Sequence, residues 1–394
     1  MGVLVAVVAH GGPAFVAALR QVWDEGDAVL PVDPRLPDPA RRRLLAMLRP
    51  AALVTPAGAG REIETLDHGR GEIGAEDALV VPTSGTTGEP KGVVLTHDAL
   101  AAHARMVHAH LGVTRADRWL ACLPLAHVGG LGVVVRALID GIGLEVHPGF
   151  DAEAVIVARD GGATLTSLVP TALDRVGAEG FRWVVLGGSA DTVAERPANV
   201  VRTWGLTETG GGVVYDGRPL PGVEVRAIDG ELWVRSPTLA RGVRRADTTV
   251  GDLRRARPED PTSTGWLATG DGGDVAANGT VTVRGRRDDM IVTGGENVWP
   301  DTVEAVLRLH PALAEVAVAG RPDTEWGQRV VAWVVPRDGV PRPSLDEVRG
   351  RVRDALPAWC APRELRVVAA LPRTPLGKVR RGALRTGETP DGPG

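Results

Sequence analysis

The chain has 394 residues, which is too long for one ordinary domain and predicts two or three. Its 45 basic and 49 acidic residues give a net charge of −4, which argues against a nucleic-acid partner. Cys122 and Cys360 lie far apart without CxxC spacing, which disfavours a disulfide framework or a zinc site and favours a cytoplasmic location.

The first twelve residues form a short apolar run, "MGVLVAVVAHGG", which we interpret as a buried strand or helix. The run lacks the basic residues that precede the apolar part of a signal peptide. No run in the chain reaches the roughly 18 apolar residues that a membrane-spanning helix needs. We therefore expect no membrane span.

A polar loop lies between two valine-rich runs, residues 78–82 and 92–97, that are typical of strands. The loop and its edges supply hydroxyl groups, glycines and one lysine: Thr83, Ser84, Gly85, Thr86, Thr87, Gly88 and Lys91. These groups suit a polyphosphate, although an ordinary turn is the alternative. Pro90 blocks helix continuation, so we expect the loop to link two strands and not to open a helix as a P-loop does.

The middle of the chain alternates strand-like and helix-like segments. The predicted strands are 118–125, 163–170, 181–188 and 199–205, and the predicted helices include 97–112 and 170–178. This alternation is typical of an α/β sheet covered by helices. From about Pro221 to residue 286, apolar and polar residues alternate around Asp-Gly and Asn-Gly turns, which predicts a small antiparallel β region.

The last hundred or so residues predict a small α+β domain. The expected elements are a helix at 300–311, strands at 314–320 and 328–336, a helix at 344–357 and a strand at 364–372. The tail, residues 385–394, is expected to be disordered. We place a large domain at 1–286, a hinge at 287–289 and the small domain at 290–394.

Three further stretches carry residues suited to chemistry. Glu208 beside Thr207 offers oxygen ligands of the kind that Mg²⁺ prefers, unless it is only an exposed loop glutamate. Asp271 stands in a glycine-rich turn, where its carboxylate could accept hydrogen bonds from ribose hydroxyls or form an Asx turn. Lys378 follows a glycine in a proline-interrupted stretch and is otherwise an ordinary surface lysine.

The order of these motifs is more informative than any one of them. TSGTTGEPKG, WGLTE, TGD, GRRDDMIVTGGENVWP and PLGK follow one another as in the adenylate-forming superfamily of acyl-CoA synthetases, peptide-synthetase adenylation domains and luciferases, which the chain resembles from about Asp77 to Leu384. The resemblance implies a large N-terminal domain of α/β sheets with a small β-barrel-like region, and a small mobile C-terminal α+β domain. It also implies that MgATP converts a carboxylic acid to an acyl-adenylate, whose acyl group then passes to a thiol such as coenzyme A.

The resemblance assigns the ATP contacts to particular residues. The loop residues from Thr83 to Lys91 would hold the β- and γ-phosphates, while Thr207 and Glu208 would hold the α-phosphate and Mg²⁺. The remaining contacts to adenine and ribose would come from Gly187, Gly188, Ser189, Trp204, Gly205, Asp271 and Arg286. Trp204 stands where the family usually has a stacking tyrosine, and its indole still offers an aromatic face.

Three other residues would serve the reaction steps. Lys378 would bridge the carboxylate and the α-phosphate, because a preorganised ammonium stabilises the negative charge that concentrates there. Asp288 would be the hinge about which the small domain rotates between the two half-reactions. His127 would line the acyl pocket and thiol tunnel, unless it is a hydrogen-bonded core histidine.

Only about 80 residues precede the phosphate loop, so the chain resembles the short members of the superfamily, and four stretches, beginning at residues 30, 123, 202 and 361, look especially like the actinobacterial o-succinylbenzoate–CoA ligases of menaquinone biosynthesis. Such a substrate keeps a second, free carboxylate, so a cationic or hydroxyl partner is expected, with Ser167, Thr171 and His127 as candidates. Two alternatives stay open: a ligase that activates another aryl or acyl acid for CoA, a carrier protein or an amine, and a catalytically silent nucleotide-binding homologue. A homodimer is possible.

Overall fold

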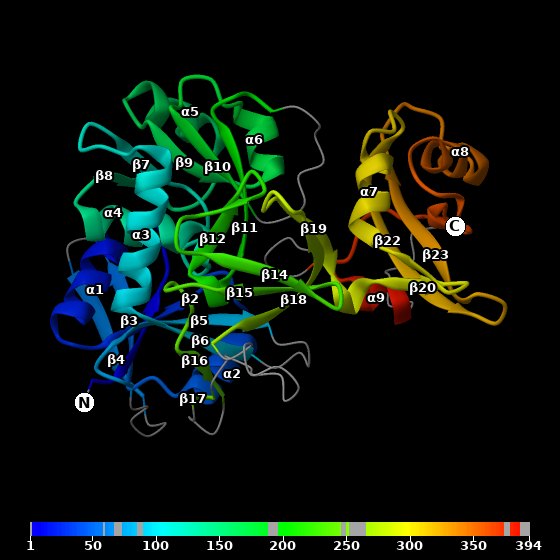
Figure 1. The fold of residues 1–394 in the computed structure, drawn as a ribbon. Helices are drawn as coiled ribbons and strands as arrows, with labels where there is room; N and C mark the ends of the chain where they lie inside the picture. The colour runs from blue at the N-terminus through cyan, green and yellow to red at the C-terminus, as the bar shows by residue number, and fades with distance from the viewer. Residues whose placement is uncertain are drawn as a thin grey trace.

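The computed structural model of the protein describes residues 2–57, 60–66, 73–84, 90–187, 196–245, 250–251, 265–373 and 379–386. Figure 1 shows a large part, which begins at the N-terminus, and a smaller part that contains the C-terminal segments. Both parts combine helices with sheets. The predicted fold class, α/β with a large N-terminal and a small C-terminal domain, is confirmed.

The first sheet is built around the apolar N-terminal run. Its eight strands lie in the order β17-β16-β6-β5-β2-β1-β3-β4. They are β1 (Leu4–Val8), β2 (Ala28–Val32), β3 (Ala52–Ala57), β4 (Gly60–Thr65), β5 (Asp77–Ser84), β6 (Pro90–Thr96), β16 (Gly242–Arg244) and β17 (Val250–Gly251). Helices α1 (Pro13–Asp24) and α2 (Asp38–Leu48) connect β1 to β2 and β2 to β3. All residues of β1 are buried, with alternate side chains in two separate core clusters, as in a strand covered on both faces.

Strands β5 and β6 flank the predicted phosphate loop. They pair antiparallel, with Thr83 opposite Lys91 and Ser84 opposite Pro90. The loop therefore links two strands of one sheet, as Pro90 predicts. Residues 85–89 lie outside the described residues.

The second sheet carries most of the predicted middle strands. Its seven strands lie in the order β13-β12-β11-β10-β9-β7-β8. They are β7 (Arg118–Ala121), β8 (Gly143–Val146), β9 (Leu165–Leu168), β10 (Trp183–Leu186), β11 (Val200–Leu206), β12 (Gly211–Tyr215) and β13 (Arg218–Pro219). The associated helices are α3 (His97–Leu111), α4 (Val128–Asp140), α5 (Ala152–Asp160) and α6 (Pro170–Val176), and a 3-10 turn, η1 (Thr207–Thr209), follows β11. The predicted helices at 97–112 and 170–178 are thus α3 and α6.

One apolar core joins the two large sheets. It contains Leu79 of β5, Leu100 and Val107 of α3, Val134 of α4 and Val185 of β10. Helix α3 begins immediately after β6, where the Thr96 hydroxyl accepts a hydrogen bond from Ala99 N at 3.1 Å. Because α3 and α4 fill the space between the sheets, the strand ends of both sheets are held in a fixed relation.

A small antiparallel sheet follows, as the alternating pattern predicts. Its strands β14 (Glu224–Ile228), β15 (Glu231–Arg235), β18 (Leu267–Val275) and β19 (Val281–Arg286) lie in that order. Asp229 and Gly230 both have positive φ, 50° and 74°, in the two-residue turn between β14 and β15. This geometry explains the Asp-Gly pair. The described strands form an open four-stranded sheet.

A 3-10 turn, η3 (Arg287–Asp289), follows β19 and spans the predicted hinge residues, and the elements of the small domain come after it. The sheet of that domain has the order β21-β20-β23-β22, with β24 paired to β23. The elements are β20 (Ile291–Thr293), β21 (Glu296–Val298), α7 (Pro300–Arg308), β22 (Leu313–Asp323), β23 (Gly327–Pro336), α8 (Leu345–Ala355), η4 (Ala358–Cys360), β24 (Glu364–Val367) and α9 (Arg381–Thr386). Every element expected after residue 299 is present, while most of the tail, residues 387–394, lies outside the described residues. None of the described helices is long and apolar enough to cross a bilayer.

Candidate active site

The predicted phosphate lysine and the predicted magnesium carboxylate lie side by side. Lys91 Nζ on β6 donates to Glu208 Oε1 on η1 at 3.0 Å, although 117 residues separate them in the chain. The backbone reinforces this contact, because Ala240 N donates to the Glu208 carbonyl at 2.8 Å. The two large sheets therefore meet at these two residues.

Thr83 lies on β5, directly opposite Lys91 in the same hairpin. Its Oγ1 is buried and, among the residues that the structure describes, has no hydrogen-bond partner. A buried donor of this kind gains free energy when a ligand oxygen accepts its hydrogen bond. Four predicted loop residues, Gly85 to Gly88, lie outside the described residues, and the Ser84 side chain does too.

The turn that carries Thr207 and Glu208 is fixed by hydrogen bonds beneath it. The Thr209 hydroxyl accepts from Leu206 N at 2.8 Å and donates to the Gly211 carbonyl at 2.7 Å. His103 of α3 lies with Nε2 at 3.0 Å from the Gly212 carbonyl. Burial lowers the pKa of His103 to about 3, so the ring is neutral, and Nε2 must carry the donated proton because a carbonyl only accepts.

A second group of predicted residues meets at the edge of the small antiparallel sheet. Trp204 Nε1 of β11 donates to Asp271 Oδ2 at 2.8 Å, and Arg286 Nη1 of β19 donates to Asp271 Oδ1 at 3.0 Å. Burial raises the pKa of Asp271, while the two hydrogen bonds and the Arg286 charge oppose that rise. Each carboxylate oxygen is thus oriented by one donor, which leaves further lone pairs for ligand hydroxyls.

Two glycines predicted to contact the nucleotide, Gly187 and Gly205, lie directly after a strand and within one. Gly187 directly follows β10, and its N–H donates to the Leu168 carbonyl at 3.1 Å. Gly205 lies in β11, where a Cβ would overlap the carbonyl oxygen of Gly211. Only glycine therefore allows β11 and β12 to approach this closely. Gly188 and Ser189 lie outside the described residues.

His127 stands at the N-terminus of α4 and faces an aspartate of the first sheet. Its Nε2 lies 3.5 Å from Asp33 Oδ2. Burial raises the pKa of Asp33, but the hydrogen bonds and charge of Arg35 outweigh this effect and lower it. The Asp33 carboxylate therefore lies within ion-pair distance of the His127 ring, and no hydrogen bond joins the two among the described residues. The predicted roles of His127 in the acyl pocket and thiol tunnel stay predictions.

The candidates for the free carboxylate differ in their surroundings. Ser167 on β9 is buried, whereas Thr171 on α6 is exposed. Arg136 of α4, which the sequence analysis did not single out, is buried with Nη2 at 3.5 Å from the Ser167 hydroxyl. Within the described residues no carboxylate lies within ion-pair distance of Arg136, and burial lowers its pKa. One signal was available in the sequence: a lone arginine in the apolar run "GLGVVVRALI".

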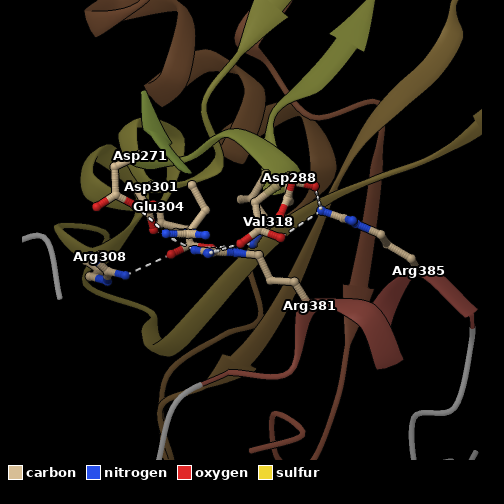
Figure 2. A network of polar contacts seen from close by, with 10 residues as sticks. Asp271, Asp288, Asp301, Glu304, Arg308, Val318, Arg381 and Arg385 are labelled. Carbon is tan, nitrogen blue, oxygen red and sulfur yellow. Dashed lines mark hydrogen bonds and ion pairs between the residues drawn. The ribbon is translucent and has the colours of Figure 1, made fainter. Parts of the chain in front are cut away.

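The predicted hinge residue precedes the small domain in the chain, and the predicted catalytic lysine lies within the residues assigned to that domain. Asp288 lies in η3, where its carbonyl accepts from Arg385 Nη2 at 3.0 Å, a contact drawn in Figure 2. Trp299 packs on Gly272 of β18, where a Cβ would overlap the indole ring. Lys378 lies outside the described residues, and so its distance from the other site residues stays a prediction.

Comparisons with known proteins give the same picture of the chain. Residues 1–243 match the family described as AMP-binding enzyme, and residues 302–378 match the AMP-binding enzyme C-terminal domain. A probable 2-succinylbenzoate–CoA ligase of Mycobacterium tuberculosis (strain CDC 1551 / Oshkosh) is 39% identical over 369 residues, which cover 88% of this chain and 93% of the relative. The 2-succinylbenzoate–CoA ligase of Bacillus cereus (strain Q1) is 33% identical over 353 residues. The matched region covers 80% of this chain and 71% of that relative.

A solved structure extends the likeness to the fold. The o-succinylbenzoate coenzyme A synthetase from Bacillus subtilis, in complex with AMP, superposes with a TM-score of 0.81 at 26% identity, over 97% of this chain and 88% of that one. The resemblance inferred from the five ordered motifs is therefore confirmed.

Proposed function

The chain belongs to the AMP-binding enzyme family, and we propose that it activates o-succinylbenzoate with MgATP and transfers the acyl group to coenzyme A. The observation that carries this proposal is the contact between Lys91 and Glu208, which unites the phosphate-binding and magnesium-binding candidates at 3.0 Å. A cation and a carboxylate in one place can serve a polyphosphate and its metal ion together.

Magnesium fits the residues that are present. The described residues hold no group of three or more His, Cys, Asp or Glu side chains that could bind a metal. Mg²⁺ usually binds one or two carboxylates and takes its other ligands from substrate phosphates and water. Glu208 would supply the carboxylate, with Thr207 nearby, and the bound ion would neutralise charge on the phosphates.

The nucleoside would lie against the second group. Asp271 would accept hydrogen bonds from the two ribose hydroxyls, while Trp204 and Arg286 hold its oxygens in place. In the first half-reaction the acid carboxylate attacks the α-phosphorus and pyrophosphate leaves. Lys378 would stabilise the charge of that step, which is worth about 3–4 kcal/mol for a single preorganised donor.

The buried Arg136 supports an acid with a second negative charge. A cation taken out of water is costly unless an anion compensates it. The free carboxylate of o-succinylbenzoate would supply that anion near Ser167, whereas a simple benzoate or fatty acid would not. The relatives that carry the name 2-succinylbenzoate–CoA ligase support the same acid and the same acceptor.

Release of pyrophosphate tests this proposal. The purified protein would be supplied with MgATP and a panel of acids, including o-succinylbenzoate, benzoate and a fatty acid, each with and without coenzyme A. We expect turnover that requires the acid and magnesium and is fastest with o-succinylbenzoate and coenzyme A. Tight ATP binding without turnover on any acid would favour a silent nucleotide-binding homologue.

Higher kcat/KM with a benzoate or fatty acid, or with an amine or carrier protein as acceptor, would refute the proposed substrates and leave the reaction class standing. A rotation of the small domain about Asp288 between half-reactions, a cytoplasmic location and a homodimer are further predictions.

A further inference from the structure

An arginine of α9 lies among three carboxylates of the predicted hinge and of α7 (Figure 2). Arg381 is three residues after Lys378, and its side chain is 14% exposed. Its guanidinium forms ion pairs with Asp289 at 3.1 Å, Asp301 at 2.6 Å and Glu304 at 2.8 Å. Burial lowers the pKa of Arg381, but the three carboxylates outweigh this effect and raise it above its usual value, so the side chain stays charged.

Glu304 fixes this cluster to the body of the small domain. It is 2% exposed, and it accepts from Val318 N of β22 at 2.8 Å and from Arg308 at 2.8 Å. Burial raises the pKa of Glu304, and the Arg381 charge opposes that rise. Helix α7, strand β22 and helix α9 are therefore joined through one buried carboxylate.

The same cluster holds the predicted hinge. Asp289 accepts from Arg381 through Oδ2 at 3.1 Å and from Arg385 through Oδ1 at 2.8 Å. Arg385 also donates to the Asp288 carbonyl at 3.0 Å. The peptide group between Asp288 and Asp289 is thus attached to α9. A rotation of the small domain would therefore take place about backbone bonds that precede this peptide group.

The segment that contains Lys378 is attached to the cluster at its described ends. Arg373 and Val379 form an antiparallel bridge, and Arg380 N donates to the Pro372 carbonyl at 2.8 Å. Leu371 and Leu384 are both buried in the core under the small-domain sheet. Arg381 directly follows these paired residues, 372–373 and 379–380, and its ion pairs determine where they lie relative to the predicted hinge.

We propose that Arg381 is a positioning residue for adenylate formation: its ion pairs to Asp289, Asp301 and Glu304 hold the predicted hinge, α7 and the start of α9, three residues after Lys378, in one arrangement. This role rests on the proposed function, because it presumes that Lys378 acts in the first half-reaction. All three carboxylates follow Asp288 in the chain, so this arrangement stays intact when the small domain rotates about that residue. Its geometry matters only in the step that uses Lys378.

The test separates the half-reactions in the full-length protein. ATP–pyrophosphate exchange with o-succinylbenzoate measures adenylate formation, and coenzyme A capture of supplied acyl-adenylate measures the second step. Arg381→Gln should lower the exchange rate by about 10- to 100-fold, because a misplacement of about 1 Å at a reacting group can cost about 100-fold. The KM for ATP and the capture rate should change by less than about twofold.

Other variants make the result specific. Arg380→Gln removes the same charge from the exposed neighbouring residue and should behave as the wild type. Arg381→Lys keeps the charge but cannot contact three carboxylates as a planar fork does, and so it should restore only part of the exchange rate. Arg385→Gln removes only the hydrogen bonds to Asp289 and to the Asp288 carbonyl, and should lower the exchange rate about threefold or more. This variant keeps the test available if Arg381→Gln does not fold.

Two results would overturn the proposed role. Equal loss of exchange and capture in folded Arg381→Gln, or in Arg385→Gln, would mean that the cluster only stabilises the small domain. Wild-type exchange in Arg381→Lys and Arg385→Gln would mean that the lysine segment needs no such anchor. A wild-type protein without any exchange would instead refute the proposed function itself.

Discussion

The indole of Trp204 offers the sharpest perturbation of the nucleotide site. Its Nε1 donates to Asp271 Oδ2 at 2.8 Å, and Arg286 occupies the other oxygen. Trp204→Phe keeps an aromatic face for adenine and removes only the donor. In the proposed site the ribose hydroxyls would donate to this carboxylate, and ATP binding would then require Asp271 to be ionised.

The size of the effect follows from this single contact. A hydrogen bond to a charged group contributes about 1.5–3 kcal/mol, and about 1.4 kcal/mol corresponds to one pH unit of a titration. Burial already raises the pKa of Asp271, nearby Asp301 on α7 raises it further, and Trp204 and Arg286 oppose both effects. ATP affinity is present above this pKa and is lost as the pH falls through it. In Trp204→Phe the acid limb should therefore move to higher pH by about one to two pH units.

The assay is kcat/KM for ATP, measured by ATP–pyrophosphate exchange across the acid and neutral range. The matched control is Trp183→Phe on the neighbouring strand β10, which removes an indole hydrogen bond of 3.0 Å to the Leu111 carbonyl of α3. The control profile should coincide with that of the wild type. An unshifted profile in Trp204→Phe would refute the role of the indole as a donor to Asp271 and would favour stacking alone.

Four other substitutions test the proposed roles. Lys378→Ala should lower the rate of adenylate formation by about 100-fold or more and leave coenzyme A capture of supplied adenylate unchanged. Asp288→Pro, which fixes the φ angle at the predicted hinge, should leave adenylate formation unchanged and lower the capture rate. Loss of both steps in Lys378→Ala would argue against separate small-domain orientations for the two half-reactions. Glu208→Gln should raise the magnesium concentration needed for half-maximal exchange, and an unchanged requirement would remove Glu208 from the metal site. Arg136→Met should lower kcat/KM about tenfold or more for o-succinylbenzoate but not for benzoate, because an ion pair is lost only with the former; equal losses would contradict the assignment.

Local patterns were sufficient to predict most elements of the fold. The β-branched runs beside the phosphate loop became β5 and β6, and Pro90 correctly indicated a strand after the loop. The Asp229-Gly230 turn needed positive φ at both residues, which the residue types alone indicate. For the apolar N-terminal run the sequence could not decide between a strand and a helix, because periodicity does not separate a buried strand from a buried helix. The run forms strand β1.

The contacts within the site could not be predicted in the same way. Lys91 and Glu208 were each named from motifs, but only the packing of two sheets brings them to 3.0 Å across 117 residues. The Arg381 cluster unites α7, η3 and α9, and no local pattern indicates which carboxylates an arginine will meet. The bond from Trp204 to Asp271 likewise depends on how β11 lies against β18, and so an indole expected to stack is also a donor.

Product analysis tests the central claim most directly. The protein, MgATP, o-succinylbenzoate and coenzyme A would be incubated together, and the nucleotides and thioesters quantified by mass spectrometry. The account predicts AMP and pyrophosphate in amounts equal to the o-succinylbenzoyl-CoA thioester, with the acyl-adenylate accumulating when coenzyme A is omitted. Formation of ADP in place of AMP, or AMP without any adenylate or thioester, would contradict it.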